Sequence, residues 1–138
     1  MNTRAAELWK LLKAAIAGGA ATLADVAVLT LLVAGLGLTP AAANVPALVV
    51  GGVVNFFGNR HFAFRARSGD VVQQAVRYGV VEIVALVLNG VLYAAAIHAA
   101  GARASHLFWA IRLATSHVVF LGWSYPLWRH VFRVPQPA

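Results

Sequence analysis

The chain lacks cysteine altogether and has little charge. Only 11% of its 138 residues are Asp, Glu, Lys or Arg, and just four of these are acidic. A soluble domain usually carries about twice that charged fraction. The absence of cysteine excludes disulfides and thiol chemistry. With so few charged residues, the chain cannot cover itself with a surface typical of a soluble protein, so most of it must be hidden from water.

Long apolar runs show where the chain is hidden. Hydrophobic residues make up 61% of the sequence. Asp25 is the only ionisable side chain between Lys13 and Arg60. A membrane-spanning helix needs about 20 mainly apolar residues, and nothing here alternates as a barrel strand does. Turn-forming segments divide the runs, so we predict an all-α integral membrane protein with four transmembrane helices at 14–36, 40–58, 78–100 and 107–127.

One short pattern occurs twice. Residues 55–65 read N-F-F-G-N-R-H-F-A-F-R, and residues 124–133 read S-Y-P-L-W-R-H-V-F-R. Each copy closes an apolar span with an Arg-His pair followed by an aromatic residue. The repeat predicts a single domain of two similar hairpins, 14–58 and 78–127, joined by a cytoplasmic loop at 59–77.

The placement of the basic residues predicts the orientation. The net charge of +7 would suggest nucleic acid in a soluble protein. Here nine of the 11 Lys and Arg residues lie on the side of the termini and central loop, which the positive-inside rule assigns to the cytoplasm. We therefore predict both termini in the cytoplasm, a multi-pass protein of the inner (cytoplasmic) membrane, and no nucleic-acid partner. The nine are Arg4, Lys10, Lys13, Arg60, Arg65, Arg67, Arg77, Arg129 and Arg133. The simplest interpretation is that they set the topology and contact anionic membrane lipid.

Polar residues inside the spans are functional candidates, because ionisable groups are costly in hydrocarbon. Asp25 lies about 16 Å into its span, near the midplane. Glu82 lies only about 6 Å from the cytoplasmic end of its span, where an ion pair with Arg77, Arg60 or Arg129 is as good an interpretation as a functional site. A pair of Asp25 with Arg112 and a neutral Asp25 with one hydrogen bond both remain open. Four other polar residues of the spans also have a purely structural interpretation, hydrogen bonding across helix contacts; they are Asn44, Asn89, Thr115 and Ser116.

No pattern of catalytic chemistry is present. The five histidines show no metal-ligand spacing. There is no glycine-rich phosphate loop, nucleophile elbow or catalytic dyad. We expect no enzyme activity, no metal and no cofactor.

The chain resembles the GtrA-like family of small four-span membrane proteins over residues 8–133. The landmarks are G-G-A-A-T-L-A-D at 18–25, A-N at 43–44, N-F-F-G-N-R-H-F-A-F at 55–64, and R-Y-G at 77–79 with Asn89. In the second copy of the repeat, Ser124 replaces the first Asn and Trp128 the second, which departs from the family pattern.

The resemblance implies a role in surface polysaccharide synthesis, with translocation of a polyprenyl-phosphate-linked sugar across the membrane as the expected activity. Under this hypothesis, the lipid phosphate would be bound by Arg60, Arg129 and Arg77. The sugar or its path would be lined by Asp25, Asn44, Asn55, Asn59, Glu82, Asn89 and Arg112.

Two other functions fit the same sequence. The chain could be a non-transporting partner that holds a polyprenyl-phosphate glycosyltransferase at the membrane. It could also be a small proton-coupled exporter of cationic compounds, which needs a carboxylate beside an aromatic cage; the span around Asp25 has no aromatic residue. Because four helices leave little room for a sugar, we expect a homo-oligomer, with a dimer as the simplest case.

Overall fold

The computed structural model describes residues 3–101 and 104–133, and within this range all regular structure is helical. This confirms the all-α class, while the topology stays a prediction. The chain divides into two compact units at Gly69 and Asp70. Unit 1 comprises residues 3–69, and unit 2 comprises residues 70–133.

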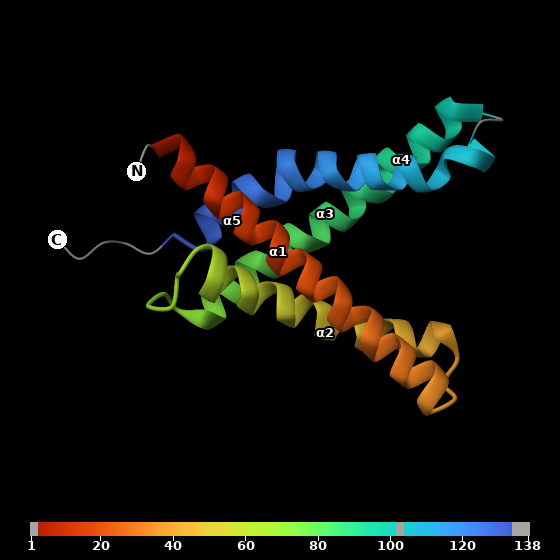
Figure 1. Ribbon diagram of the computed structural model, residues 1–138, viewed down its shortest axis with the longest axis horizontal. Coiled ribbons are helices and arrows are strands. Elements are labelled where there is room, and N and C mark those ends of the chain that lie inside the picture. The colour runs from red at the N-terminus through yellow and green to blue at the C-terminus, as the bar shows by residue number, and fades with distance from the viewer. Residues whose placement is uncertain (1–2, 102–103, 134–138) are drawn as a thin grey trace. The chain divides into compact units, whose positions relative to one another are not determined.

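Unit 1 is a pair of long helices (Figure 1). Helix α1 (Thr3–Thr30) continues into the π-helical segment η1 (Leu31–Gly35). After a turn through Gly37, at φ 68°, helix α2 (Pro40–Gly58) begins and continues into the π-helical segment η2 (Asn59–Ala63). The side chain of Thr39 accepts a hydrogen bond from the Ala42 amide and so caps α2.

Small residues let α1 and α2 approach closely. A Cβ atom on Gly51 would lie 3.0 Å from the Cβ of Asp25, and one on Gly58 would lie 3.0 Å from the Cβ of Ala17. Such contacts are typical of membrane helices, which associate through close backbone packing. The buried alanines of this contact are Ala14, Ala17, Ala21, Ala43 and Ala47.

Unit 2 is a second helical hairpin. Helix α3 (Val71–Ala100) begins at Asp70, whose carboxylate accepts a hydrogen bond from the Gln73 amide at 2.8 Å. The returning helix runs without a break through α4 (Ala104–Val119), the π-helical segment η4 (Phe120–Ser124) and α5 (Tyr125–Val131). Trp123 donates its indole N–H to the carbonyl of Val81 at 3.1 Å, and this hydrogen bond joins η4 to α3.

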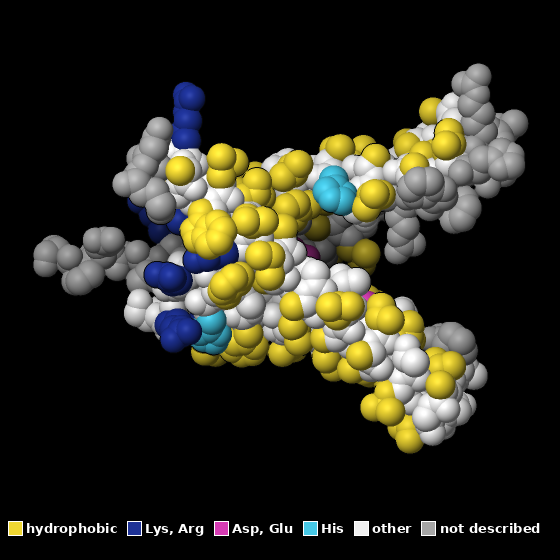
Figure 2. Space-filling model, viewed as in Figure 1, with side chains coloured by type: hydrophobic (Ala, Val, Ile, Leu, Met, Phe, Trp, Pro, Cys, Tyr) yellow, Lys and Arg dark blue, Asp and Glu magenta, His cyan; other side chains and the backbone are white. Residues whose placement is uncertain are grey.

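The outer surface of these helices is apolar. Large hydrophobic side chains such as Leu23 and Leu86 are exposed, and yellow side chains run along α1 and α2 (Figure 2). Three helices in the described part are long and apolar enough to cross a membrane: Arg4–Gly35, Ala42–Ala63 and Val71–Ala100. Their exposed side chains therefore fit contact with lipid. The predicted span at 107–127 falls on α4, η4 and α5 and stays a prediction.

The helices are longer than the predicted spans. Helix α1 begins at Thr3, because no glycine or proline interrupts the segment before residue 14. The predicted loop at 59–77 keeps only residues 64–70 outside helices, since η2 extends α2 and Asp70 starts α3 early. A membrane-spanning helix often extends beyond the hydrocarbon layer, so the longer helices do not contradict the predicted spans.

Candidate functional site

Arg60, predicted as a phosphate ligand, is buried and holds the loop that follows it. Only 8% of Arg60 is exposed. One guanidinium nitrogen, Nη2, donates hydrogen bonds to the carbonyls of Arg67 at 2.8 Å and Gly69 at 2.9 Å. The other, Nη1, lies 3.0 Å from Nε2 of His61. This role could not be predicted from the sequence, because the carbonyls belong to residues seven and nine positions further on.

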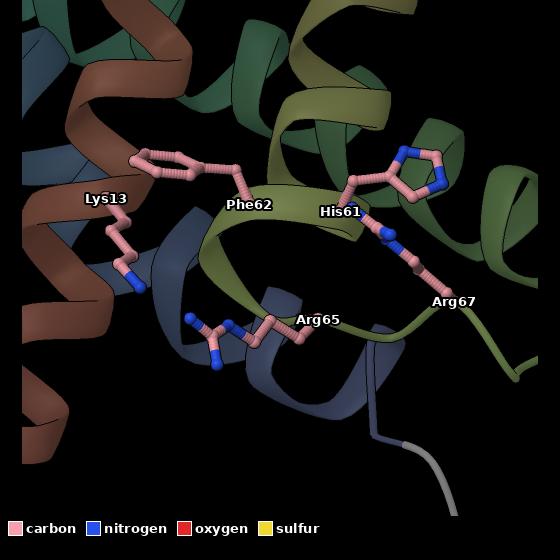
Figure 3. Close-up of a pocket in the computed structure, with 5 residues that line it drawn as sticks. All are labelled: Lys13, His61, Phe62, Arg65 and Arg67. Carbon is pink, nitrogen blue, oxygen red and sulfur yellow. The ribbon is translucent and has the colours of Figure 1, made fainter.

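The loop held by Arg60 borders a basic cavity of about 460 Å³ within unit 1, which is open to the surface. Its lining residues come from α1, from η2 and from the loop (Figure 3). The charged ends of Lys13 and Arg65 turn toward each other, and Arg67 extends back toward His61. Phe62 completes the lining. In Figure 2, dark blue side chains gather at this end of unit 1.

Lys13 is held in place by aromatic rings, although it carries a charge. It is only 8% exposed, and its ammonium lies 5.2 Å from the centroid of the Trp9 ring and 5.4 Å from that of Phe62. Cation–π contacts of this kind favour a desolvated cation. Lys13 was used in the sequence analysis for topology alone; its spacing from Trp9, one helical turn, was the signal that could have suggested a structured site.

Two predicted residues of the motif form a local asparagine pair. Asn59 is fully buried, and its Nδ2 donates to Oδ1 of Asn55 at 2.8 Å and to the Asn55 carbonyl at 2.9 Å. The Oδ1 of Asn59 is buried and accepts no hydrogen bond from the described residues. A buried acceptor without a donor costs free energy, so Asn59 stays a candidate to accept a hydrogen bond from a sugar hydroxyl.

Asp25 lies at the contact between α1 and α2. Its Cβ is the atom that a side chain on Gly51 would meet, and Asp25 is neither fully buried nor fully exposed. The carboxylate is therefore placed where the glycine of α2 leaves room. Asn44, in contrast, is exposed on α2. Asn44 therefore does not lie with Asp25 in the contact between α1 and α2.

In unit 2, Glu82 lies in a cluster of aromatic residues. Its Oε1 accepts a hydrogen bond from the indole N–H of Trp128 at 3.0 Å. The ring of Trp128 lies 5.6 Å from that of Tyr78 and 5.7 Å from that of Phe120, measured between centroids. From the sequence, Asp25 was the carboxylate considered for an aromatic cage, and the contact of Glu82 with aromatic residues was not predicted.

The remaining predicted residues of unit 2 are in different surroundings. Asn89 donates to Oγ of Ser116 at 3.2 Å, which is the hydrogen bond across helices expected from its structural interpretation. Arg77 and Arg129 are exposed. Since Arg60 belongs to unit 1, a phosphate site shared by all three arginines stays a prediction. The side chain of Arg112 lies outside the described part, so its pair with Asp25 also stays a prediction.

The apolar helices and their buried polar residues define a multi-pass membrane protein. Residues 14–132 match the family GtrA/DPMS, transmembrane domain. The chain belongs to this family, which confirms the resemblance found in its motifs and indicates a role in polysaccharide or glycolipid synthesis. No curated protein and no solved structure matches the chain.

Proposed function

We propose that this protein moves a polyprenyl-phosphate-linked sugar across the inner membrane for the synthesis of a surface polysaccharide or glycolipid. The protein performs no chemistry in this role. It supplies positive charge at the cytoplasmic interface for the phosphate and polar groups within the helices for the sugar. A dimer would give the sugar more room than one four-helix chain. A glycosyltransferase that makes the lipid-linked sugar is the expected partner.

The observation that carries the proposal is the position of Asp25. A carboxylate in the middle of an apolar helix costs free energy, and close packing of α1 against α2 needs only small residues. Asp25 nonetheless lies in that contact, opposite Gly51. A carboxylate there can accept hydrogen bonds from sugar hydroxyls, which a purely structural contact does not require.

The first experiment is a flipping assay in liposomes that contain purified protein and a fluorescent polyprenyl-phosphate sugar. We expect the wild-type protein to flip the lipid and Asp25→Asn to lose at least about tenfold in rate, because a neutral amide accepts weaker hydrogen bonds than a carboxylate. The matched control is Thr30→Val on the same helix, because the hydroxyl of Thr30 donates a hydrogen bond to the carbonyl of Val26 within that helix. This control should flip at the wild-type rate.

Two outcomes would favour the alternatives. No flipping above empty liposomes, with folded protein and several sugars, would favour a non-transporting partner of a glycosyltransferase. Uptake of a cationic dye driven by a pH gradient in the same liposomes would favour the proton-coupled exporter. The exporter is supported by one specific observation: the carboxylate of Glu82 accepts a hydrogen bond from the indole N–H of Trp128, whose ring packs with those of Tyr78 and Phe120.

A further inference from the structure

We infer that the basic cavity of unit 1, lined by Lys13, His61, Phe62, Arg65 and Arg67, binds the phosphate group of a lipid with an apolar chain. The inference deepens the proposed function, on which the identity of the lipid rests. It also moves the phosphate site of unit 1 away from Arg60, which is already bonded to two backbone carbonyls.

The cavity holds positive charge without a carboxylate. Lys13, Arg65 and Arg67 are among its five lining residues, and none of the five is acidic. All four acidic residues of the chain have other surroundings: Glu7 pairs with Lys10, Asp70 caps α3, Glu82 bonds to Trp128, and Asp25 lies against α2. Cations gathered without a counterion repel each other, and an anion among them relieves that repulsion.

Lys13 and the backbone of the loop are held in position before any ligand arrives. Lys13 is fixed between two aromatic rings. Arg60 fixes the loop by bonding to the carbonyls at its far end. Arg65 adopts a left-handed backbone conformation, at φ 52°, which costs a residue other than glycine free energy. Strain of this kind is often retained at binding sites, and the guanidinium of Arg65 extends toward Lys13 (Figure 3).

The surroundings favour a phosphate on an apolar chain over a free phosphate ion. Trp9 is 51% exposed and Phe62 is 45% exposed, and both contact Lys13. An apolar chain can lie over these rings while its phosphate meets Lys13 and the two arginines. Guanidinium groups bind phosphate with paired, charge-assisted hydrogen bonds. The volume of about 460 Å³ is within the usual range of small-molecule sites.

The test is calorimetric titration of the full-length protein in non-ionic detergent at low ionic strength. The probes are farnesyl phosphate, farnesol and inorganic phosphate. The test variant is R65Q/R67Q, whose altered side chains are exposed and should not disturb folding. The matched control is R4Q/R133Q, which removes the same charge from two exposed arginines outside the cavity. Circular dichroism and gel filtration establish that both variants are folded.

We expect farnesyl phosphate to bind wild type and R4Q/R133Q equally, and to bind R65Q/R67Q roughly tenfold or more weakly. Farnesol and inorganic phosphate should each bind far more weakly than farnesyl phosphate. Equal loss of affinity in both double variants would overturn the inference, because net charge would then explain binding. Equal binding of farnesol would overturn it in favour of apolar adsorption, and equal binding of inorganic phosphate would show a site for the free ion.

The result is separable from the proposed function. If farnesyl phosphate binding depends on Arg65 and Arg67 but the protein flips no lipid, the phosphate site is supported and translocation is refuted. If R65Q/R67Q flips lipid at the wild-type rate, translocation is supported and the phosphate site is refuted.

Discussion

At the scale of single residues, the two copies of the Arg-His motif share a buried hydrogen-bond donor before the arginine but differ in the burial of the arginine itself. Asn59 and Trp128 occupy equivalent places, and both are buried in their own units. Each donates its side-chain N–H within its hairpin, Asn59 to Asn55 and Trp128 to Glu82. The following arginine differs, since Arg60 is buried and Arg129 is exposed. Asn59 and Trp128 therefore play similar structural roles in the two copies, whereas Arg60 and Arg129 do not.

This difference predicts unequal effects of the same substitution. Arg60→Gln should lower the free energy of unfolding by about 2 kcal/mol, because two charge-assisted hydrogen bonds to the carbonyls of Arg67 and Gly69 are lost. It should also release the loop that contains Arg65 and Arg67, both of which are trypsin sites. Faster tryptic cleavage there, together with a lower melting temperature in detergent, would be the measured result.

Arg129→Gln is the comparison, because it makes the same change in the second copy. Its effect on the melting temperature should be smaller, since the side chain of Arg129 is exposed. If Arg60→Gln leaves both the melting temperature and the cleavage rate unchanged, the guanidinium does not hold the loop.

At the scale of helices, the contact between α1 and α2 depends on Gly51, which faces α1, and not on its neighbour Gly52. Gly51→Val should destabilise the protein by about 1–3 kcal/mol, because its Cβ would lie 3.0 Å from the Cβ of Asp25 and 3.3 Å from the carbonyl oxygen of Ala21. Gly52→Val is the matched control, since a Cβ there meets nothing within 4 Å. Thermal unfolding of both variants in the same detergent distinguishes them, and equal melting temperatures would refute the close contact.

The helices themselves could be predicted from the sequence, whereas the cavity could not. Hydropathy adds up along the chain, so the apolar runs and the turn near Gly37 are visible without a structure. The cavity joins Lys13 of α1 to residues more than 45 positions later, and its shape depends on hydrogen bonds from Arg60 to backbone carbonyls. In the sequence, Lys13, Arg65 and Arg67 are visible only as positive charge beside a membrane, and Arg60 as a phosphate ligand, so the cavity and the structural role of Arg60 could not be predicted.

At the scale of the whole molecule, the orientation in the membrane decides whether the cavity can meet its proposed ligand. Polyprenyl-phosphate sugars that need translocation start on the cytoplasmic side under the proposed function, so the loop at 64–69 must face the cytoplasm. The absence of native cysteine allows a direct test with single cysteines. Ser68→Cys marks this loop, and Leu38→Cys marks the turn before α2; both positions are exposed.

In intact cells, a membrane-impermeant maleimide should label Leu38→Cys at once and Ser68→Cys only after lysis. Leu86→Cys, on the exposed apolar face of α3, should react poorly in both conditions because it faces lipid, and the native chain gives the background. The expectation rests on the nine basic residues placed on the side of Ser68. Labelling in the reverse order would place Lys13, Arg65 and Arg67 outside the cell. The cavity could then only receive lipid phosphate that had already crossed, and the proposed direction of transport would have to be inverted.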